Sequence, residues 1–302
     1  MTNAIATGGL TKDYGAGRGI FDLDLEVTKG EIFGYLGPNG AGKTTTIRLL
    51  MGMIHPTRGG ARVFDLDCQK QSVEVKRRVS YLPGDLPQLA GLRGSEVVAY
   101  VGGLRGGVDT GRVAALCERF DLDLSRRYRE YSHGNKQKLA LVLAFMSAPD
   151  LLILDEPTSG LDPLNQQSFY DLLGEVHDAG ATVFLSSHIL SEVEHVCDRV
   201  GIVRSGHLVK VASLDELHEI RIHHVEVEVE GELPMAALRA AGVEQLVCED
   251  GRARFVARGS FAPVLAALAG SRVVNLTSHE PSLEETFLAY YEETETVADD
   301  ER

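Results

Sequence analysis

The hydrophobic pattern divides the chain into two parts of different texture. From residue 1 to about 218, short apolar runs alternate with stretches whose apolar positions recur at a helical period. A continuous apolar run such as "LLIL" at 151–154 is typical of a strand buried on both faces of a parallel sheet. Strands of this kind that alternate with helices predict an α/β domain, with a mostly parallel sheet covered on both faces.

Three apolar runs predict the strands at the centre of that sheet. They are "EIFGYLG" at Glu31–Gly37, "LLILD" at Leu151–Asp155 and "ATVFLSSH" at Ala181–His188. The first run leads directly into a glycine-rich loop. The stretch "KTTTIRLLMGM", which starts at Lys43, predicts the helix that follows this loop.

From about residue 223 the pattern changes to strict alternation. In "VEVEVEG", Val225, Val227 and Val229 share one face and glutamates share the other, which predicts a half-buried strand. A short helix ("PMAALRAAG"), two strands joined at Asp250–Gly251, a second helix ("SFAPVLAALAG") and a strand ("RVVNLTS") follow. This β-α-β-β-α-β order is that of a ferredoxin-like α+β domain.

These patterns predict an organisation in three regions. Residues 1–218 form the larger domain, residues 219–290 form the ferredoxin-like accessory domain, and residues 291–302 form an acidic tail that we expect to be disordered. A last helix is predicted to begin at Pro281, with Ser282 near its N-cap.

The glycine-rich loop predicts a phosphate site. "GPNGAGKT" fits the pattern G-x-x-x-x-G-K-[ST] in full, between a predicted strand and a predicted helix. Glycines let backbone amides approach phosphate oxygens, the lysine reaches the β- and γ-phosphates, and the final hydroxyl can ligate Mg²⁺. The loop therefore predicts a site for the phosphates of a nucleotide with Mg²⁺, formed by Gly37, Pro38, Asn39, Gly40, Ala41, Gly42, Lys43 and Thr44.

An acidic pair follows the buried run "LLIL". A carboxylate at the C-terminal end of a strand next to the P-loop strand is suited to hold Mg²⁺, and Asp155 fits that role together with Thr44. Glu156 fits a general base or a water-positioning group for in-line attack on the γ-phosphate. An Asp-Glu pair alone is more often a solvated strand end, but the P-loop in the same chain favours the catalytic interpretation.

In the order and spacing of these motifs, residues 1 to about 218 resemble the nucleotide-binding subunits of ATP-binding cassette (ABC) transporters. The resemblance implies a P-loop fold with a RecA-like core, an antiparallel β subdomain and a helical subdomain at about 85–145. It implies that the nucleotide is ATP, that the P-loop runs from Gly37 to Thr45, and that Tyr14 in "TKDYG" stacks on adenine. It also implies that His188 in "SSH" is the switch histidine that contacts the γ-phosphate, and that "SGLD", ending at Asp162, is the D-loop.

"YSHGN", at residues 131–135, stands where the family has its signature sequence, usually Leu-Ser-Gly-Gly-Gln. Ser132 and Gly134 are retained, whereas His133 and Asn135 differ from the family pattern. Signatures of this form are similar to those of the family's drug-export and polysaccharide-export-like branch. The resemblance implies that Ser132, Gly134 and Asp162 act on the ATP held by a second copy of the chain.

A second departure concerns the Q-loop, where the family's glutamine is expected at Gly84. The run here is "YLPGDLPQ", so Gly84 offers no side chain to ligate Mg²⁺ or orient water. Asp85 and Gln88 are the two candidates to substitute for it, and we assign Asp85 as a candidate metal ligand.

The resemblance implies a function and its partners. The chain is expected to be an ATPase that energises efflux of a drug, antibiotic, lipid or similar amphiphile. Two copies would bind head to tail and dock on a separately encoded, multi-span permease at the inner face of the cell membrane. The accessory domain resembles the C-terminal extension of the ABC-2-type export branch, where it is either a packing and dimerisation module or a regulatory ligand site.

Composition narrows the alternatives. A formal net charge of −14 argues against nucleic acid as a partner, since phosphate backbones demand a basic surface. The alternative functions are a soluble ABC ATPase acting on nucleic acid or ribosomes, and a P-loop kinase, which would leave "YSHGN" unexplained.

The longest apolar run, "LALVLAFM", is short of the roughly 20 residues that span a bilayer. No signal peptide is expected. The four scattered cysteines are expected to be reduced core thiols, as in a cytoplasmic protein: Cys68, Cys117, Cys197 and Cys248.

Overall fold

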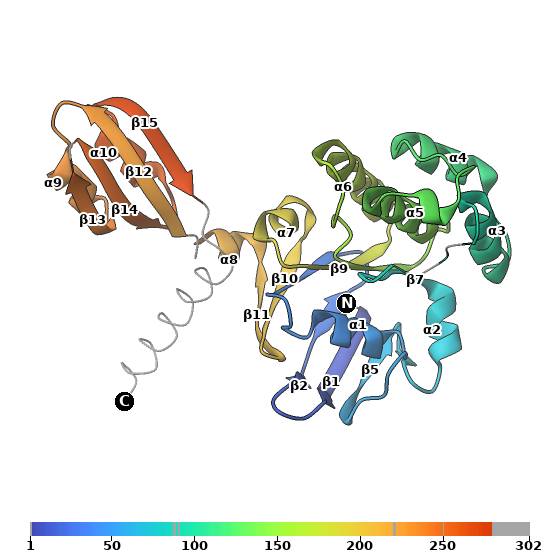
Figure 1. Ribbon diagram of the computed structural model, residues 1–302. Coiled ribbons are helices and arrows are strands. Elements are labelled where there is room, and N and C mark those ends of the chain that lie inside the picture. Colours follow the sequence, from blue (N-terminus) through green and yellow to red (C-terminus); the bar gives the residue numbers. More distant parts are fainter. Residues whose placement is uncertain (1, 87–88, 90, 220–221, 250, 280–302) are drawn as a thin grey trace. The chain divides into compact units, whose positions relative to one another are not determined.

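The computed structural model describes residues 2–86, 89, 91–219, 222–249 and 251–279. The chain divides into two compact units, Met1–Val211 and Ala212–Arg302; two sheets lie in the first unit and a third lies in the second (Figure 1). Gln88, the helix predicted from Pro281 and the acidic tail lie outside the described residues. Within these described ranges, no helix is both long enough and apolar enough to cross a membrane.

A six-stranded sheet forms the centre of the first unit, with the order β11-β10-β4-β9-β8-β7. The pairs along β10, β4, β9, β8 and β7 are parallel, so the carboxyl ends of these strands meet at one edge. Every residue of β4, β8 and β9 is buried, which explains their continuous apolar sequences. The strands are β4 (Ile32–Leu36), β7 (Val79–Leu82), β8 (Leu151–Asp155), β9 (Thr182–Ser187), β10 (Arg199–Arg204) and β11 (His207–Ser213).

The strand order corrects one prediction. We expected β8, which ends at Asp155, to lie next to the P-loop strand β4. Instead β9 pairs with both and lies between them. The sequence of each strand is apolar throughout, so nothing in the local pattern decides which buried strand takes the middle position.

A second sheet of the first unit is antiparallel. Its order is β2-β1-β5-β6, and β3 also pairs with β1. The core beneath it is continuous with one face of the parallel sheet, and includes Ile5, Ile47 and Phe184. The strands are β1 (Asn3–Asp13), β2 (Gly19–Leu23), β3 (Glu26–Thr28), β5 (Arg58–Val63) and β6 (Leu66–Asp67).

Helices cover the parallel sheet on both faces, with α1 on one side and α5 and α6 on the other (Figure 1). Helix α1 begins at Lys43 because Gly42, at φ 108°, turns the loop in a conformation that favours glycine. The helices of the first unit are α1 (Lys43–Leu50), α2 (Ser72–Arg78), α3 (Gly94–Leu104), α4 (Thr110–Arg119), α5 (His133–Phe145), α6 (Pro163–Asp178) and α7 (Leu190–Val196), with a 3₁₀ turn η1 (Tyr128–Glu130) before α5. Helix α8 (Leu214–Glu219) lies at the start of the second unit.

The second unit holds a four-stranded antiparallel sheet with the order β13-β14-β12-β15. The predicted alternation is confirmed, because Val225, Val227 and Val229 are buried in a core with Leu238 of α9 and Val264 of α10. The predicted hairpin joins β13 to β14. The elements are β12 (Ile222–Glu230), α9 (Met235–Ala240), β13 (Glu244–Glu249), β14 (Arg252–Arg258), α10 (Ala262–Leu268) and β15 (Arg272–His279).

The cysteines only partly match the prediction of core thiols. All four are free, and Cys68 and Cys197 are buried. Cys117 is only partly buried and Cys248 is exposed, so the prediction is wrong for these two. Cys248 lies on β13, at the edge of the second sheet, where the core face of the strand is not fully covered.

Gly34 on β4 sets how closely helix α7 packs on the parallel sheet. A Cβ at this position would lie 2.5 Å from Val193 Cγ1 and 3.0 Å from Cys197 Sγ. We therefore expect Gly34→Ala to lower the free energy of unfolding by about 1–3 kcal/mol, measured by urea denaturation. Gly8→Ala is the matched control, because its Cβ would have no neighbour within 4 Å. Equal stability of the two variants would contradict this packing argument.

Candidate ATP site

A hollow of about 730 Å³ lies where the carboxyl ends of β4, β8 and β9 meet the start of α1. The P-loop supplies one wall, and the acidic pair and His188 supply another. The predicted residues that line it are Tyr14, Asn39, Gly40, Gly42, Lys43, Thr44, Thr45, Asp85, Asp155, Glu156 and His188. Ligands of open α/β sheets bind at this edge of the sheet. Residues that are far apart in sequence are thus brought to one site.

Lys43 places its ammonium group inside the loop that precedes α1. The residue is only 6% exposed. Its Nζ donates to the carbonyl oxygens of Gly37 at 2.7 Å and Pro38 at 3.3 Å, and lies 3.1 Å from Glu156 Oε1. These contacts fix the position of the cation beside the α1 N-terminus. The lysine and the helix end together favour a bound anion.

Glu156 is held at the centre of the site in an unusual backbone conformation. Its φ of 51° lies in the left-handed region, which costs a non-glycine residue roughly 1–3 kcal/mol. Its amide donates to Ser186 O at 3.2 Å, and its Oε2 lies 2.6 Å from His188 Nδ1. In the tautomer that carries its proton on Nδ1, the imidazole donates to this carboxylate oxygen. Glu156 therefore joins Lys43 to His188.

Asp155 is suited to hold a divalent cation. It is 1% exposed, and two hydroxyl groups donate to its carboxylate: Thr44 Oγ1 at 2.9 Å and Ser186 Oγ at 2.5 Å. A carboxylate and a hydroxyl oxygen side by side are the hard ligands that Mg²⁺ prefers. The donor set of Thr44 and Asp155 thus fits the predicted cation.

Gly84, where the family's Q-loop glutamine is expected, lies directly beside the carboxylate of Asp155. A Cβ at Gly84 would be 3.3 Å from Asp155 Oδ2. Asp85 lines the same hollow, but its side chain is 94% exposed and its Oδ2 lies 3.6 Å from Arg48. Asp85 as a metal ligand stays a prediction.

Two tyrosines near the phosphate site remain neutral at physiological pH. Burial raises the pKa of Tyr35, at the end of β4, to about 12, and its hydroxyl pairs with Thr46 of α1 at 3.3 Å. Burial, and secondarily the charge of Asp155, raises the pKa of Tyr81 to about 12. Tyr14 is 49% exposed at the rim of the hollow, where an aromatic face is available for stacking.

"YSHGN" forms the start of α5, and none of its residues is among the described residues that line the hollow. Ser132 is the N-cap, and its Oγ accepts from the Asn135 amide at 3.2 Å. Ser132 and the first turn of α5 are exposed or half-buried, so a helix N-terminus faces outward. Such an end is suited to an anion that comes from outside the chain.

Comparison with known proteins gives the site its family. A protein-family model described as "ABC transporter" matches residues 20–159. The bacitracin transport ATP-binding protein BcrA of Enterococcus faecalis is 37% identical over 235 residues, which cover 76% of this chain and 75% of that protein.

The chain belongs to the ATP-binding subunits of ABC transporters. It is therefore an ATPase that hydrolyses ATP for transport. The daunorubicin/doxorubicin resistance ATP-binding protein DrrA of Streptomyces peucetius is 35% identical and covers 78% of this chain and 76% of its own. Nod factor export ATP-binding protein I of Cupriavidus pinatubonensis is 32% identical, and the match covers 92% of this chain and 87% of that protein.

Solved structures support the same fold for the first unit. An ATP-binding subunit of an ABC transporter matches with a TM-score of 0.66 at 29% identity, over 71% of this chain and 92% of the other. A dimeric ATP-binding cassette bound to ADP and Pi matches with a TM-score of 0.63 at 19% identity, over 70% and 98%. The predicted α/β P-loop fold of an ABC ATPase is thus confirmed.

The D-loop and the signature of one chain pack against each other. Gly160, at φ 75°, leaves room for the His133 ring, because a Cβ there would lie 2.3 Å from His133 Cδ2. A Cβ at Gly134 would lie 2.8 Å from Gly160 O. His133, which replaces a family glycine, therefore rests on the D-loop.

This contact gives a double-mutant prediction. Gly160→Ala is expected to lower the free energy of unfolding by about 1–3 kcal/mol, through the clash with His133 and the positive φ. In a His133→Gly background the clash is gone and only the backbone strain remains, so the cost is expected to fall by about 1 kcal/mol. Urea denaturation of the four proteins measures the coupling. Strict additivity would contradict the packing of His133 on Gly160.

Two side chains that position the site were not predicted from the sequence. Gln137 of α5 is 1% exposed and donates to Pro157 O at 2.7 Å, which ties the signature helix to the segment after Glu156. Glu192 of α7 accepts from Thr158 and Ser187, both at 2.6 Å. The polar residues of "KQKL", which stand directly before the apolar run of the same helix, were the available signal for Gln137. Glu192 had no such signal, because its helix is short and its partners lie in other segments.

Proposed function

We propose that the chain is the ATP-hydrolysing subunit of an exporter of drug-like or similar amphiphilic compounds. The observation that carries this proposal is the set of relatives, whose names refer to bacitracin transport, daunorubicin/doxorubicin resistance and Nod factor export. The signature "YSHGN" and the second unit, which resembles the extension of export ATPases, point the same way. The compound class is taken from the names of these relatives. Nothing in this chain selects the compound, because substrate choice is expected to reside in the permease.

The proposed ATP site is shared by two copies in head-to-tail arrangement. The P-loop from Gly37 to Thr45 holds the phosphates and Tyr14 stacks on adenine. Thr44 and Asp155 would hold Mg²⁺, which would neutralise charge on the β- and γ-phosphates. Ser132, Gly134 and Asp162 of the second copy close the site from the other side. The outward-facing N-cap of α5 supports this arrangement, because it offers a hydroxyl and free amides away from the chain's own P-loop.

Hydrolysis is proposed to use the Glu156–His188 pair. Glu156 accepts a proton from the attacking water, and the water oxygen forms a bond to the γ-phosphorus as the bond to the β,γ-bridging oxygen breaks. The Nδ1–H of His188 orients the carboxylate, at 2.6 Å. A bound γ-phosphate competes with Glu156 for the ammonium of Lys43, which now lies 3.1 Å from that carboxylate. Binding thereby releases the carboxylate for the water.

Hydrolysis is also proposed to drive the conformational cycle. The γ-phosphate gives the signature of the second copy a partner, so ATP favours the closed dimer. Loss of that phosphate removes the contact and favours reopening. The helices between about residue 85 and residue 145 would transmit this motion to a separately encoded, multi-span permease. The subunit would then lie at the inner face of the cell membrane through that partner.

We further propose the domain layout given by the sequence: an ATPase domain at 1–218 and a ferredoxin-like accessory domain at 219–290. The strand order β13-β14-β12-β15, with helices α9 and α10 as the connections, supports the ferredoxin-like topology.

Co-purification and transport together test this function. The tagged chain is expected to retain a multi-span membrane protein from its own host, and the pair in vesicles should move an amphiphilic dye out of the ATP-accessible compartment. His188→Ala is the matched control, because it is expected to keep the complex but lose transport. Capture of ribosomes or nucleic acid, with no membrane protein, would contradict the proposal.

A further inference from the structure

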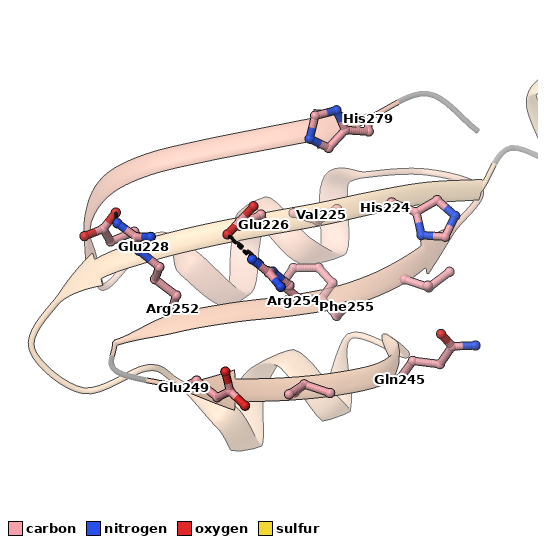
Figure 2. A pocket seen from close by; sticks show the side chains of 12 residues that line it. His224, Val225, Glu226, Glu228, Gln245, Glu249, Arg252, Arg254, Phe255 and His279 are labelled. Carbon is pink, nitrogen blue, oxygen red and sulfur yellow. Dashed lines mark hydrogen bonds and ion pairs between the residues drawn. The ribbon is translucent and has the colours of Figure 1, made fainter. Parts of the chain in front are cut away.

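The second unit presents an open sheet face that carries charge in stripes. Helices α9 and α10 cover one face, against the core of Val225, Phe255 and their neighbours. On the other face, no described element of this unit covers the side chains, and they line a shallow hollow of about 880 Å³ (Figure 2). His224 and His279 lie at one end of this hollow, and Glu228 and Arg252 lie at the other.

Each of the two central strands shows one sign of charge on the open face. Acidic side chains follow β12 at alternate positions, and basic side chains follow β14 in the same way. We call these sets the acidic stripe (Glu226, Glu228 and Glu230) and the basic stripe (Arg252, Arg254 and Arg258). The register pairs Glu226 with Arg254 and Glu228 with Arg252, so opposite charges stand at the same level of the sheet.

Ion pairs within the chain already link the two stripes. Arg254 NH2 lies 3.1 Å from Glu226 Oε1, and Arg252 NH2 lies 3.2 Å from Glu228 Oε2. The arginines are nevertheless 74% and 59% exposed. Exposed pairs of this kind contribute little to stability. Much of the surface of each guanidinium is exposed, so its N–H groups can also donate to a second carboxylate that approaches the open face.

We propose that this open face docks on the same face of a second copy of the chain. The order β13-β14-β12-β15 puts the boundary between the two stripes at the middle of the sheet. A two-fold axis that runs along the strands above this boundary lays β12 of one copy over β14 of the other. Because paired residues share a level, Glu226 then meets Arg254 of the second copy, and Glu228 meets Arg252.

The charges also exclude the other simple arrangement. A two-fold axis across the strands would lay β12 over β12 and β14 over β14, with like charges face to face. The outer strands are compatible with the first arrangement, which lays β13 of one copy over β15 of the other. Val247 then lies at the level of Thr277, and Glu249 at the level of Asn275, so no like charges meet there.

The size of the face sets the expected strength. Four strands about 4.8 Å apart and about seven residues long at ~3.3 Å each give a face of roughly 400 Å² per copy. The total of roughly 800 Å² lies below the ~1,200–2,000 Å² of stable interfaces, so the association should be weak and concentration-dependent. It needs no nucleotide, and this separates it from the ATP-dependent dimer proposed above. In a transporter with two copies of the chain, the ATP-dependent contact and the contact between the open faces would join the same two chains. Each contact would then raise the effective concentration for the other.

Charge reversal in the full-length chain tests the proposal, by sedimentation equilibrium without nucleotide and with reductant to keep Cys248 reduced. The unmodified chain is expected to dimerise at about 10⁻⁴ M. Glu226→Arg/Glu228→Arg and Arg252→Glu/Arg254→Glu should each weaken the dimer at least about tenfold, because each makes the face carry one sign. An equimolar mixture of the two variants should restore a dimer, now a heterodimer.

Two further proteins control for folding. The fourfold exchange, with all four charges swapped in one chain, keeps the pairs within the sheet and should dimerise as the unmodified chain does. Glu226→Gln/Glu228→Gln removes charge without placing like charges side by side, and should also weaken the dimer. A monomeric unmodified chain would overturn the proposal, as would a mixture of folded reversed variants that stays monomeric. A face covered by another part of the same chain would give these results.

Discussion

Replacement of Glu156 by glutamine is expected to lower the ATPase rate about 10²- to 10⁴-fold, because the amide cannot take a proton from the attacking water. Glutamine has the same shape, so the bond from His188 and the packing around the strained backbone at φ 51° are largely kept. ATP affinity should be equal or higher, since the ion pair to Lys43 at 3.1 Å no longer competes with the phosphate. Single-turnover hydrolysis and isothermal titration with Mg-ATP measure the two effects.

Glu175→Gln is the matched control for that prediction. It removes a surface carboxylate on α6 whose partner is Arg119, at 2.6 Å, and it lies outside the hollow. Its ATPase rate is expected to stay within about twofold of the unmodified chain, as for other exposed ion pairs. The proposed role of Glu156 fails if Glu156→Gln hydrolyses ATP at the unmodified rate.

Lys43→Ala is expected to weaken ATP binding about 10- to 100-fold, and to lower ATPase activity at least as much. Charge-assisted hydrogen bonds to phosphate are worth roughly 1.5–3 kcal/mol, and each 1.4 kcal/mol is a factor of ten. The side chain is only 6% exposed, and the carbonyl oxygens of Gly37 and Pro38 hold its ammonium group beside the start of α1. Titration with Mg-ATP measures the affinity, and urea denaturation checks that the variant is folded.

Two control variants sharpen this second prediction. Lys70→Ala removes an exposed lysine outside the hollow and should leave affinity unchanged. Lys43→Arg keeps the charge but places a larger, planar group where Gly37 O lies 2.7 Å away, and should still impair binding. Unaltered affinity in Lys43→Ala would mean that the phosphates bind elsewhere.

The sequence predicted the elements that local pattern controls. Continuous apolar runs located β4, β8 and β9, and the glycine loop located the start of α1 to the residue. The alternation of Val225, Val227 and Val229 located the buried face of β12. In each case the signal and the structure concern the same few neighbouring residues, so periodicity and turn chemistry were sufficient.

What depends on tertiary contacts was missed. The position of β9 between β4 and β8 depends on which buried strands pair, and all three carry similar sequences. The exposure of Cys248 follows from its place on an edge strand. The roles of Gln137 and Glu192 depend on partners in other segments. His133 looked like a departure from the family signature, and the structure gives it a contact with Gly160 instead.

The central claim is that each ATP site combines the P-loop of one copy with the signature of another, and mixing of two inactive variants tests it. Lys43→Ala disables the P-loop. Ser132→Asp sets a negative charge against the phosphate, yet it can still cap α5, so the fold is spared.

Each variant alone should lack ATPase activity, because both sites of its dimer are defective. A mixed dimer keeps one intact site, made of the P-loop of the Ser132→Asp chain and the signature of the Lys43→Ala chain. Activity is therefore predicted to reappear on mixing, with Ser132→Asn as the control that keeps the cap and adds no charge. If the mixture stays inactive while both variants are folded and associate, the site is not shared between copies and the account is wrong.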